Sequence, residues 1–142
     1  MTNSNQADNV RWLGGGCHCG TLRFEIAVPR EGEIEVLDCN CSICTKKGIL
    51  HLIVPRSRFR ALTDDARRRT YQFGTHVAEH WFCDVCGVHP YYRPRSHPED
   101  IDVNVRCLDR FHEERWRVRS FDGRNWEQNV AEIQRRPSEP KT

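Results

Sequence analysis

The stretch Cys39-Asn40-Cys41-Ser42-Ile43-Cys44 places three thiols within six residues, and the rest of the chain is organised around it. Two cysteine pairs flank it: Cys17-His18-Cys19-Gly20 comes before it and Cys83-Asp84-Val85-Cys86-Gly87 comes after it. Thiols at such short spacings are typical of zinc sites. The seven clustered thiols divide into a set of four, which closes a tetrahedral site, and a set of three, which leaves one position open.

We expect the two flanking pairs, Cys17 with Cys19 and Cys83 with Cys86, to form the closed site. The glycine that follows each pair can take the left-handed conformation, which lets backbone amides point at sulfur. Four thiolates satisfy zinc fully, so this site is predicted to be structural and to tie the beginning of the chain to its middle. The alternatives are that the pairs bind separately or that one pair is simply buried.

Cys39, Cys41 and Cys44 can converge on a second zinc ion if the chain turns helically after Cys41. Three protein ligands leave a fourth position for water or substrate, which is the mark of a catalytic zinc site, and an incoming thiol would suit that position. The alternative is a fourth protein ligand that closes the site, for which the candidates are Cys107, His51, His89 and His18. We favour a core position for Cys107, since it alternates with apolar residues of a predicted strand.

The composition is that of one polar domain. The chain has 142 residues, 30% of them charged, and a mean hydropathy of -0.75, so zinc is expected to supply part of its stability. The formal net charge of +2 is too small by itself to indicate nucleic-acid or acidic-membrane binding. No apolar run reaches the ~18 residues of a membrane helix. The N-terminus lacks the apolar core of a signal peptide, so we expect a cytoplasmic protein with reduced thiols.

Strand patterns occupy most of the chain. Residues 21–28 alternate, with their apolar side chains on one face, and residues 49–54 are apolar throughout, which favours a central strand. Other strands are predicted at residues 34–37, 69–73, 77–82, 88–92, 101–107 and 116–121. The short connections favour antiparallel pairing. The fold class is therefore mainly β.

One helix is predicted at residues 126–135, because Trp126, Val130 and Ile133 fall at helical spacing. We divide the chain into a disordered N-terminal lead at residues 1–11, a single zinc-binding domain at residues 12–136 and a tail at residues 137–142.

The cysteine pattern, together with Lys46-Lys47-Gly48 and Phe82 before the last pair, resembles the glutathione-dependent formaldehyde-activating enzyme family. Residues 87–96 and 103–109, with Phe121-Asp122-Gly123 and Trp126-Glu127, look like the branch of that family that includes centromere protein V. The resemblance covers about residues 13–133. Each motif is weak alone, but the combined spacing is highly specific.

The resemblance implies an Mss4-like fold of short strands around two zinc ions per chain. It assigns Cys17, Cys19, Cys83 and Cys86 to the structural zinc and Cys39, Cys41 and Cys44 to the catalytic zinc. The implied activity is that of a carbon–sulfur lyase, in which glutathione adds to formaldehyde to give S-hydroxymethylglutathione or a related small thiol reacts. Basic side chains that could pair with the glutathione carboxylates are Lys46, Lys47, Arg93 and Arg95.

A non-catalytic alternative is a binding module for protein or nucleic acid in which both zinc ions are structural. A continuous basic face built from residues 67–69 and 93–95 would favour it, as would a capped second zinc. A third hypothesis is a redox sensor in which the three-cysteine stretch releases its metal on oxidation. His51 and His89 are candidates for proton transfer, and the sequence does not select between them.

Overall fold

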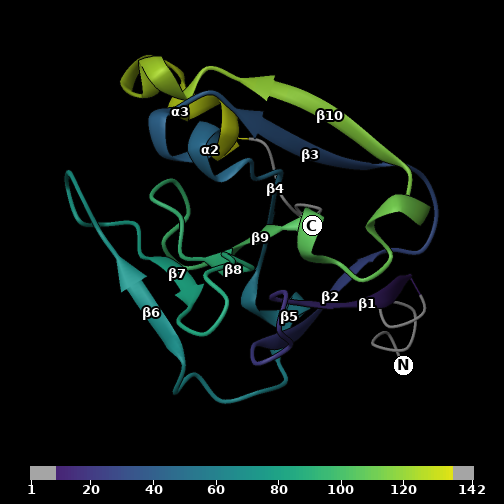
Figure 1. The fold of residues 1–142 in the computed structure, drawn as a ribbon. Coiled ribbons are helices and arrows are strands. Elements are labelled where there is room, and N and C mark those ends of the chain that lie inside the picture. Colours follow the sequence, from purple (N-terminus) through teal and green to yellow (C-terminus); the bar gives the residue numbers. More distant parts are fainter. Residues whose placement is uncertain (1–8, 136–142) are drawn as a thin grey trace.

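The computed structural model describes residues 9–135, and within this range the strands form three sheets (Figure 1). The first has the order β1-β2-β5, with β1 (Val10–Gly16), β2 (Arg23–Pro29) and β5 (Phe59–Ala61). The second has the order β10-β3-β4-β9-β8, with β10 (Trp116–Phe121), β3 (Ile34–Cys39), β4 (His51–Val54), β9 (Ile101–Asn104) and β8 (Tyr91–Tyr92). The third is a hairpin of β6 (Arg68–Tyr71) and β7 (His80–Cys83).

The helical segments are short. The C-terminal helix α3 (Trp126–Arg135) has the bounds that the sequence predicted, and its Ile133 is buried. A shorter helix, α2 (Ser42–Lys47), starts directly after Cys41, where convergence of the three thiols required a helical turn. The 3-10 turns are η1 (Arg56–Arg58), η2 (Val105–Cys107), η3 (Phe111–Glu113) and η4 (Gly123–Asn125). The protein is therefore mainly β with one C-terminal helix, as expected.

The ends of several predicted segments differ in the structure: the strands predicted at residues 77–82 and 88–92, for example, are the shorter β7 and β8. β1 begins at Val10, so Val10 and Arg11 belong to the first sheet and not to an unstructured lead. The strand predicted at residues 101–107 stops at Asn104, because the Asn104 side chain accepts a hydrogen bond of 3.2 Å from the Arg106 amide and starts the turn η2. Residues 1–8 of the predicted lead and the predicted tail at 137–142 lie outside the described residues.

One strand pair is parallel, although the short connections favoured antiparallel pairing. β10 runs parallel to β3, with Trp116 opposite Ile34 and Phe121 opposite Cys39. The argument from connection length applies only to strands that are neighbours in the sequence, and these two are far apart. Figure 1 shows the pair side by side, with α2 and α3 both at the end where the two strands finish.

One face of the five-stranded sheet belongs to the main hydrophobic core. Residues alternate along each strand, and Val54, Ile101 and Val103 point to this face, where they pack with Phe24 and Ile26 of β2. The apolar face predicted for residues 21–28 is thus buried. β4 lies in the middle of the sheet, as its apolar sequence predicted.

The opposite face of the same sheet carries polar residues. The strand register sets Leu37 opposite His51, Ile53 opposite Asp102, and Asp102 opposite Tyr92, so all five side chains share this face. His51 and Asp102 are buried even though they are polar. Among residues 9–135, no helix is long and apolar enough to span a membrane.

Candidate functional site

The two outer cysteine pairs come together in the structure. Cys17 and Cys19 lie between β1 and β2, while Cys83 ends β7 and Cys86 lies in the turn that follows. Their four Sγ atoms all lie within 4.8 Å of one another. Cys19 and Cys83 are 64 positions apart in the sequence, so this group joins the first sheet to the β6–β7 hairpin.

The sulfur positions of this group fit a tetrahedral zinc ion. A Zn–S bond of ~2.3 Å in a tetrahedron sets the sulfurs about 3.8 Å apart. The Sγ atoms of Cys17 and Cys19 are 3.7 Å apart, and so are those of Cys19 and Cys83. A disulfide would bring two sulfurs much closer, to ~2.05 Å, and all eight cysteines are free thiols.

Backbone groups around the outer pairs are arranged to support thiolates. The amide of Leu22 donates to Cys17 Sγ and the amide of Val85 donates to Cys83 Sγ, each at 3.3 Å. The glycine after each pair has a positive φ, 85° at Gly20 and 82° at Gly87, as the sequence predicted. These turns therefore point backbone N–H groups at the sulfurs.

The three-cysteine group forms where β3 meets helix α2. Cys39 is the last residue of β3, Cys41 is the N-cap of α2, and Cys44 lies in the first turn of the helix. The Cys41 Sγ accepts a hydrogen bond of 3.4 Å from the Cys44 amide. The Cys41 sulfur therefore caps the N-terminus of the helix. The three Sγ atoms lie within 4.8 Å of one another.

Hydrogen bonds within this group concentrate its negative charge on Cys41. The thiols of Cys39 and Cys44 hydrogen-bond to Cys41 and lower its pKa far below the usual range. The hydrogen bond to Cys41 raises the pKa of Cys39, and hydrogen bonds to Cys39 and Cys41 raise the pKa of Cys44. The three sulfurs thus form a compact donor set whose negative charge lies on Cys41, and thiolate donors suit zinc.

The turn before α3 covers the three-cysteine group. Gly123 is buried, and a Cβ atom at this position would overlap the Cys39 sulfur and lie 3.1 Å from the Cys41 Cβ. The turn is held by Asn40, which donates to Asp122 Oδ1 at 3.1 Å through its side-chain amide and accepts from the Arg124 amide at 2.9 Å. The absence of a side chain at Gly123 therefore makes room for the sulfurs.

Within residues 9–135, no further histidine, cysteine or carboxylate joins the three-cysteine group to make a set of four. His18 is exposed, and the His51 Nδ1 atom contacts Asp102. The Cys107 Sγ lies 3.8 Å from the backbone oxygen of His89 and belongs to neither group. All four candidates for a closing ligand therefore lie outside the group, which favours an open position.

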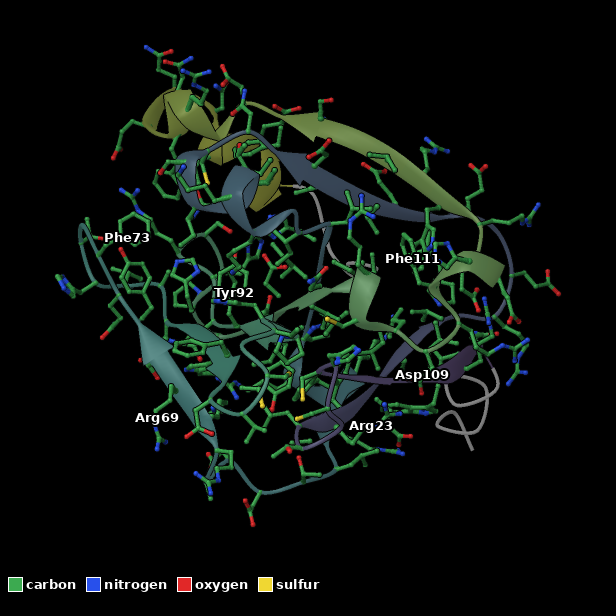
Figure 2. All side chains as sticks on the ribbon, in the orientation of Figure 1. Arg23, Arg69, Phe73, Tyr92, Asp109 and Phe111 are labelled. Carbon is green, nitrogen blue, oxygen red and sulfur yellow. The ribbon has the colours of Figure 1, made fainter. Side chains whose placement is uncertain are left out.

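A cavity of about 640 Å³ adjoins the three-cysteine group, and all three cysteines line it. This volume lies within the ~300–1,000 Å³ range of pockets for small molecules. Its apolar lining includes Leu37, Ile53, Phe73, Phe121, Trp126 and Ile133. The polar lining includes His51, His80, Tyr92 and Asp102. Figure 2 shows Tyr92 at the centre of the molecule, below α2, and Phe73 to its left, beside the β6–β7 hairpin.

His51, Asp102 and Tyr92 form a buried polar cluster on the cavity side of the sheet. The His51 Nδ1 atom lies 2.9 Å from Asp102 Oδ2 and 3.4 Å from the Tyr92 hydroxyl oxygen. Burial, and then the charge of Asp102, raise the pKa of Tyr92 well above its usual value, so its hydroxyl stays protonated.

Lys47 places a half-buried positive charge near the sulfurs. Its Nζ lies 4.3 Å from the centre of the Tyr92 ring and 3.3 Å from His80 Nδ1. His80 stacks on Tyr92 with ring centres 4.7 Å apart, and the pKa of His80 falls to about 4, first because of burial and then because of Lys47. Burial lowers the pKa of Lys47, while the charges of Cys44 and Asp102 oppose this effect.

Of the basic residues predicted to hold carboxylates, the structure places some at the cavity and others away from it. Lys46 and Arg95 line the cavity, whereas Lys47 packs inside on Tyr92 and Arg93 pairs with Glu79 at 3.4 Å. Arg95 also pairs with the exposed carboxylate of Glu127 at 2.9 Å and lies 3.6 Å from the centre of the Trp126 ring. The cavity rim therefore offers cations next to an apolar wall.

Sequence reasoning missed Asp102, Tyr92 and Gly123. Asp102 lies in the strand predicted at residues 101–107, where it alternates with apolar residues, a pattern that a solvent-exposed side chain gives equally well. The side chain is in fact buried, and only the pairing of β9 with β4 brings it to His51. No local signal separates these two situations.

The model of the family described as glutathione-dependent formaldehyde-activating enzyme matches residues 12–123, which include both cysteine groups. The chain belongs to this family. The crystal structure of a Rhodobacter sphaeroides protein is similar, with 33% sequence identity and a TM-score of 0.62, over 74% of this chain and 100% of that one.

The glutathione-dependent formaldehyde-activating enzyme family has the Mss4-like fold, and the strands and cysteine groups described above agree with it. Membership supports an activity that involves glutathione and formaldehyde at the level of the family. Both cysteine groups of this member can hold a metal ion.

Proposed function

We propose that this protein is a zinc-dependent carbon–sulfur lyase of the S-hydroxymethylglutathione synthase type, acting on glutathione and formaldehyde or on a related small thiol adduct. The observation that carries the proposal is the position of the three-cysteine group. Its sulfurs line a cavity of ligand size, and no fourth protein ligand joins them within the described part of the chain. The reaction is reversible, and the reverse direction breaks the carbon–sulfur bond.

The two cysteine groups would then have different roles. Cys17, Cys19, Cys83 and Cys86 would hold a structural zinc, and Cys39, Cys41 and Cys44 would hold a second zinc at the cavity. Zinc with three protein ligands supplies an open coordination position and lowers the pKa of a thiol that enters it. Lys47, half-buried beside the group, offsets the excess negative charge of the thiolates.

The cavity suits a thiol with anionic ends. Its apolar walls hold the reacting sulfur away from bulk water, while Lys46 and Arg95 lie where carboxylates of glutathione can pair with them. Arg124 also lines the cavity. By holding the thiol next to formaldehyde, the cavity replaces a chance encounter in solution with an oriented one. Because this addition proceeds readily without a catalyst, such orientation is the main rate acceleration that the protein can supply.

The contacts of the arginines weigh against a nucleic-acid-binding module. Of the arginines that would have formed a basic face, Arg67 and Arg69 both pair with Asp84, at 3.6 and 2.9 Å, and Arg68 pairs with Asp65 at 3.3 Å. Arg93 and Arg95 pair with glutamates, as described above. These partners cancel much of the field that phosphate binding needs. Reduced thiols and glutathione also agree with the cytoplasmic location that we infer.

The first experiment measures zinc content and zinc-edge X-ray absorption with and without glutathione. Two zinc ions per chain are expected, and glutathione should raise the mean coordination from about 3.5 to about 4 sulfurs per zinc. The exchange of ¹³C-formaldehyde with its glutathione adduct, followed by NMR, should be faster with the protein than without it. Unchanged coordination together with the uncatalysed exchange rate would refute the proposal and favour a binding module.

A further inference from the structure

The His51–Asp102 pair is almost completely buried. The exposed fractions of the two side chains are 5% and 3%, and the His51 Nδ1 atom lies 2.9 Å from Asp102 Oδ2. Two atoms of the pair, His51 Nε2 and Asp102 Oδ1, are buried without a hydrogen-bond partner in the protein. Each such atom costs ~1–3 kcal/mol. An unpartnered ring nitrogen on a side chain that lines a cavity can form a hydrogen bond with a bound ligand.

The contact with Asp102 orients the His51 ring. A carboxylate accepts hydrogen bonds, so Nδ1 carries a proton and donates to Asp102 Oδ2. In the neutral form of the ring, Nε2 is then the nitrogen with the lone pair. The Tyr92 hydroxyl lies 3.4 Å from the same Nδ1 atom, and burial and then the charge of Asp102 raise the pKa of Tyr92, so Tyr92 and Asp102 both face this side of the His51 ring.

The strand register brings His51 to the same cavity as the sulfurs. His51 lies opposite Leu37 in the β3–β4 pair, and Cys39 is two residues further along β3, so both point to one face. His51 and the three cysteines line the cavity together. His89 is also half-buried and also has an unpartnered ring nitrogen, Nδ1, but it packs against Phe82 and does not line this cavity. The geometry thus distinguishes two histidines that the sequence did not.

We propose that His51, oriented by Asp102 and Tyr92, is the residue that carries the proton during addition of the thiol to the aldehyde. This inference rests on the function proposed above and assigns a catalytic residue to it. His51 Nε2 takes the proton of the incoming thiol as the sulfur forms its bond to the carbonyl carbon. The π electrons of the C=O bond move to oxygen, and the same Nε2–H then protonates that oxygen. No net proton is consumed, and the reverse path uses the same group.

Asp102 and Tyr92 act on the reaction through His51, as positioning residues. In Asp102→Asn, the side-chain amide can donate to Nδ1 and shift the proton to Nε2, which then has no lone pair for the thiol proton. Tyr92→Phe keeps the ring that stacks on His80 and removes only the hydroxyl. We therefore expect a large rate loss from Asp102→Asn and a smaller one from Tyr92→Phe.

The test compares His51→Gln with the matched control His89→Gln in zinc-loaded protein. Zinc content and the calorimetric affinity for glutathione should remain those of the wild type in both variants. The exchange rate above the uncatalysed background should fall ~100-fold or more in His51→Gln and stay within a factor of a few in His89→Gln. Imidazole added to His51→Ala should restore part of the lost rate.

A second readout does not depend on activity. ¹⁵N NMR of the zinc-loaded wild type should show His51 protonated at Nδ1 and unprotonated at Nε2, and Asp102→Asn should change this tautomer. A wild-type catalytic rate in His51→Gln, or a proton on Nε2 in the wild type, would overturn the relay and leave the lyase proposal intact. A wild type that binds zinc and accelerates no exchange would remove the lyase proposal and the relay with it.

Discussion

Replacement of Cys83 by serine should destabilise the protein far more than replacement of Cys41 by serine. Cys83 has an exposed fraction of 0%, and its group joins segments that are 64 positions apart. Closing a loop of that length in the unfolded chain costs ~4 kcal/mol, and a metal that bridges it only in the folded state contributes a similar amount to stability. This is a large part of the ~5–15 kcal/mol that stabilises a typical domain.

The three-cysteine group differs because it is local. Its sulfurs lie within six residues, so the unfolded chain can also bind zinc there, and binding to both states cancels in the folding equilibrium. Serine at position 41 can still cap helix α2, since its hydroxyl accepts the Cys44 amide as the sulfur does. We therefore expect a loss below ~1 kcal/mol from Cys41→Ser, which leaves a difference of ~3 kcal/mol or a shift of about 10 °C in Tm.

The assay is urea unfolding followed by tryptophan fluorescence, with zinc content measured on each folded protein. Cys107→Ser is the control, because Cys107 belongs to neither group. Each of the other two variants should retain one zinc, and Cys41→Ser should stay close to the control in stability. Equal destabilisation by Cys83→Ser and Cys41→Ser would show that the two groups do not divide into structural and cavity roles.

Three other changes probe the surroundings of the cavity. Gly123→Ala should weaken zinc binding by the three-cysteine group, because the added Cβ overlaps the Cys39 sulfur. Gly14→Ala is the control and should leave zinc binding unchanged, since its Cβ would meet its nearest atoms at 3.5 Å. Competition with a chelator measures the zinc affinity of both variants. Lys47→Met should weaken zinc binding at the same site about tenfold, because it removes a half-buried cation. Lys46→Met, on the exposed side of α2, should change zinc binding little, and equal effects of the two changes would contradict the charge argument. The pKa of His80 is about 4 in the folded protein, below the ~6.5 of the unfolded chain, so the unfolded state binds more protons between these values. The contribution of His80 to the free energy of unfolding should therefore be complete above about pH 6.5 and fall as the pH drops toward 4, by at most ~1.4 kcal/mol per pH unit. His80→Asn should show a shallower pH dependence of stability in urea unfolding. An unchanged slope would refute the lowered pKa of His80.

Most of what could be predicted about the candidate site followed from the cysteine spacing. Zinc needs several thiolates that converge on one point, and short spacings such as C-x-C-x2-C achieve this with local turns alone. The same logic placed α2 after Cys41 and positive φ angles at the glycines after the outer pairs, and both are present. The alternating strand at residues 21–28 and the helix at 126–135 followed from periodicity, which is also local.

The strand pairing was harder to predict. The parallel β10–β3 pair joins distant segments, and nothing in either strand specifies its direction. It matters for the site, because it brings Phe121 next to Cys39 and places Gly123 over the sulfurs. Connection lengths could not reveal a contact that the chain reaches only after passing through the other sheets.

The sequence by itself determined the set of thiols and the family to which they belong. Only the tertiary structure decided what faces those thiols. His51, Asp102 and Tyr92 lie on three different strands, and the β4–β9–β8 register turns them to one face and toward one cavity. Alternation along a strand tells which residues share a face, but the identity of the opposing residue depends on long-range pairing. A buried histidine that lines a cavity and an exposed surface histidine therefore look alike until the sheet is assembled.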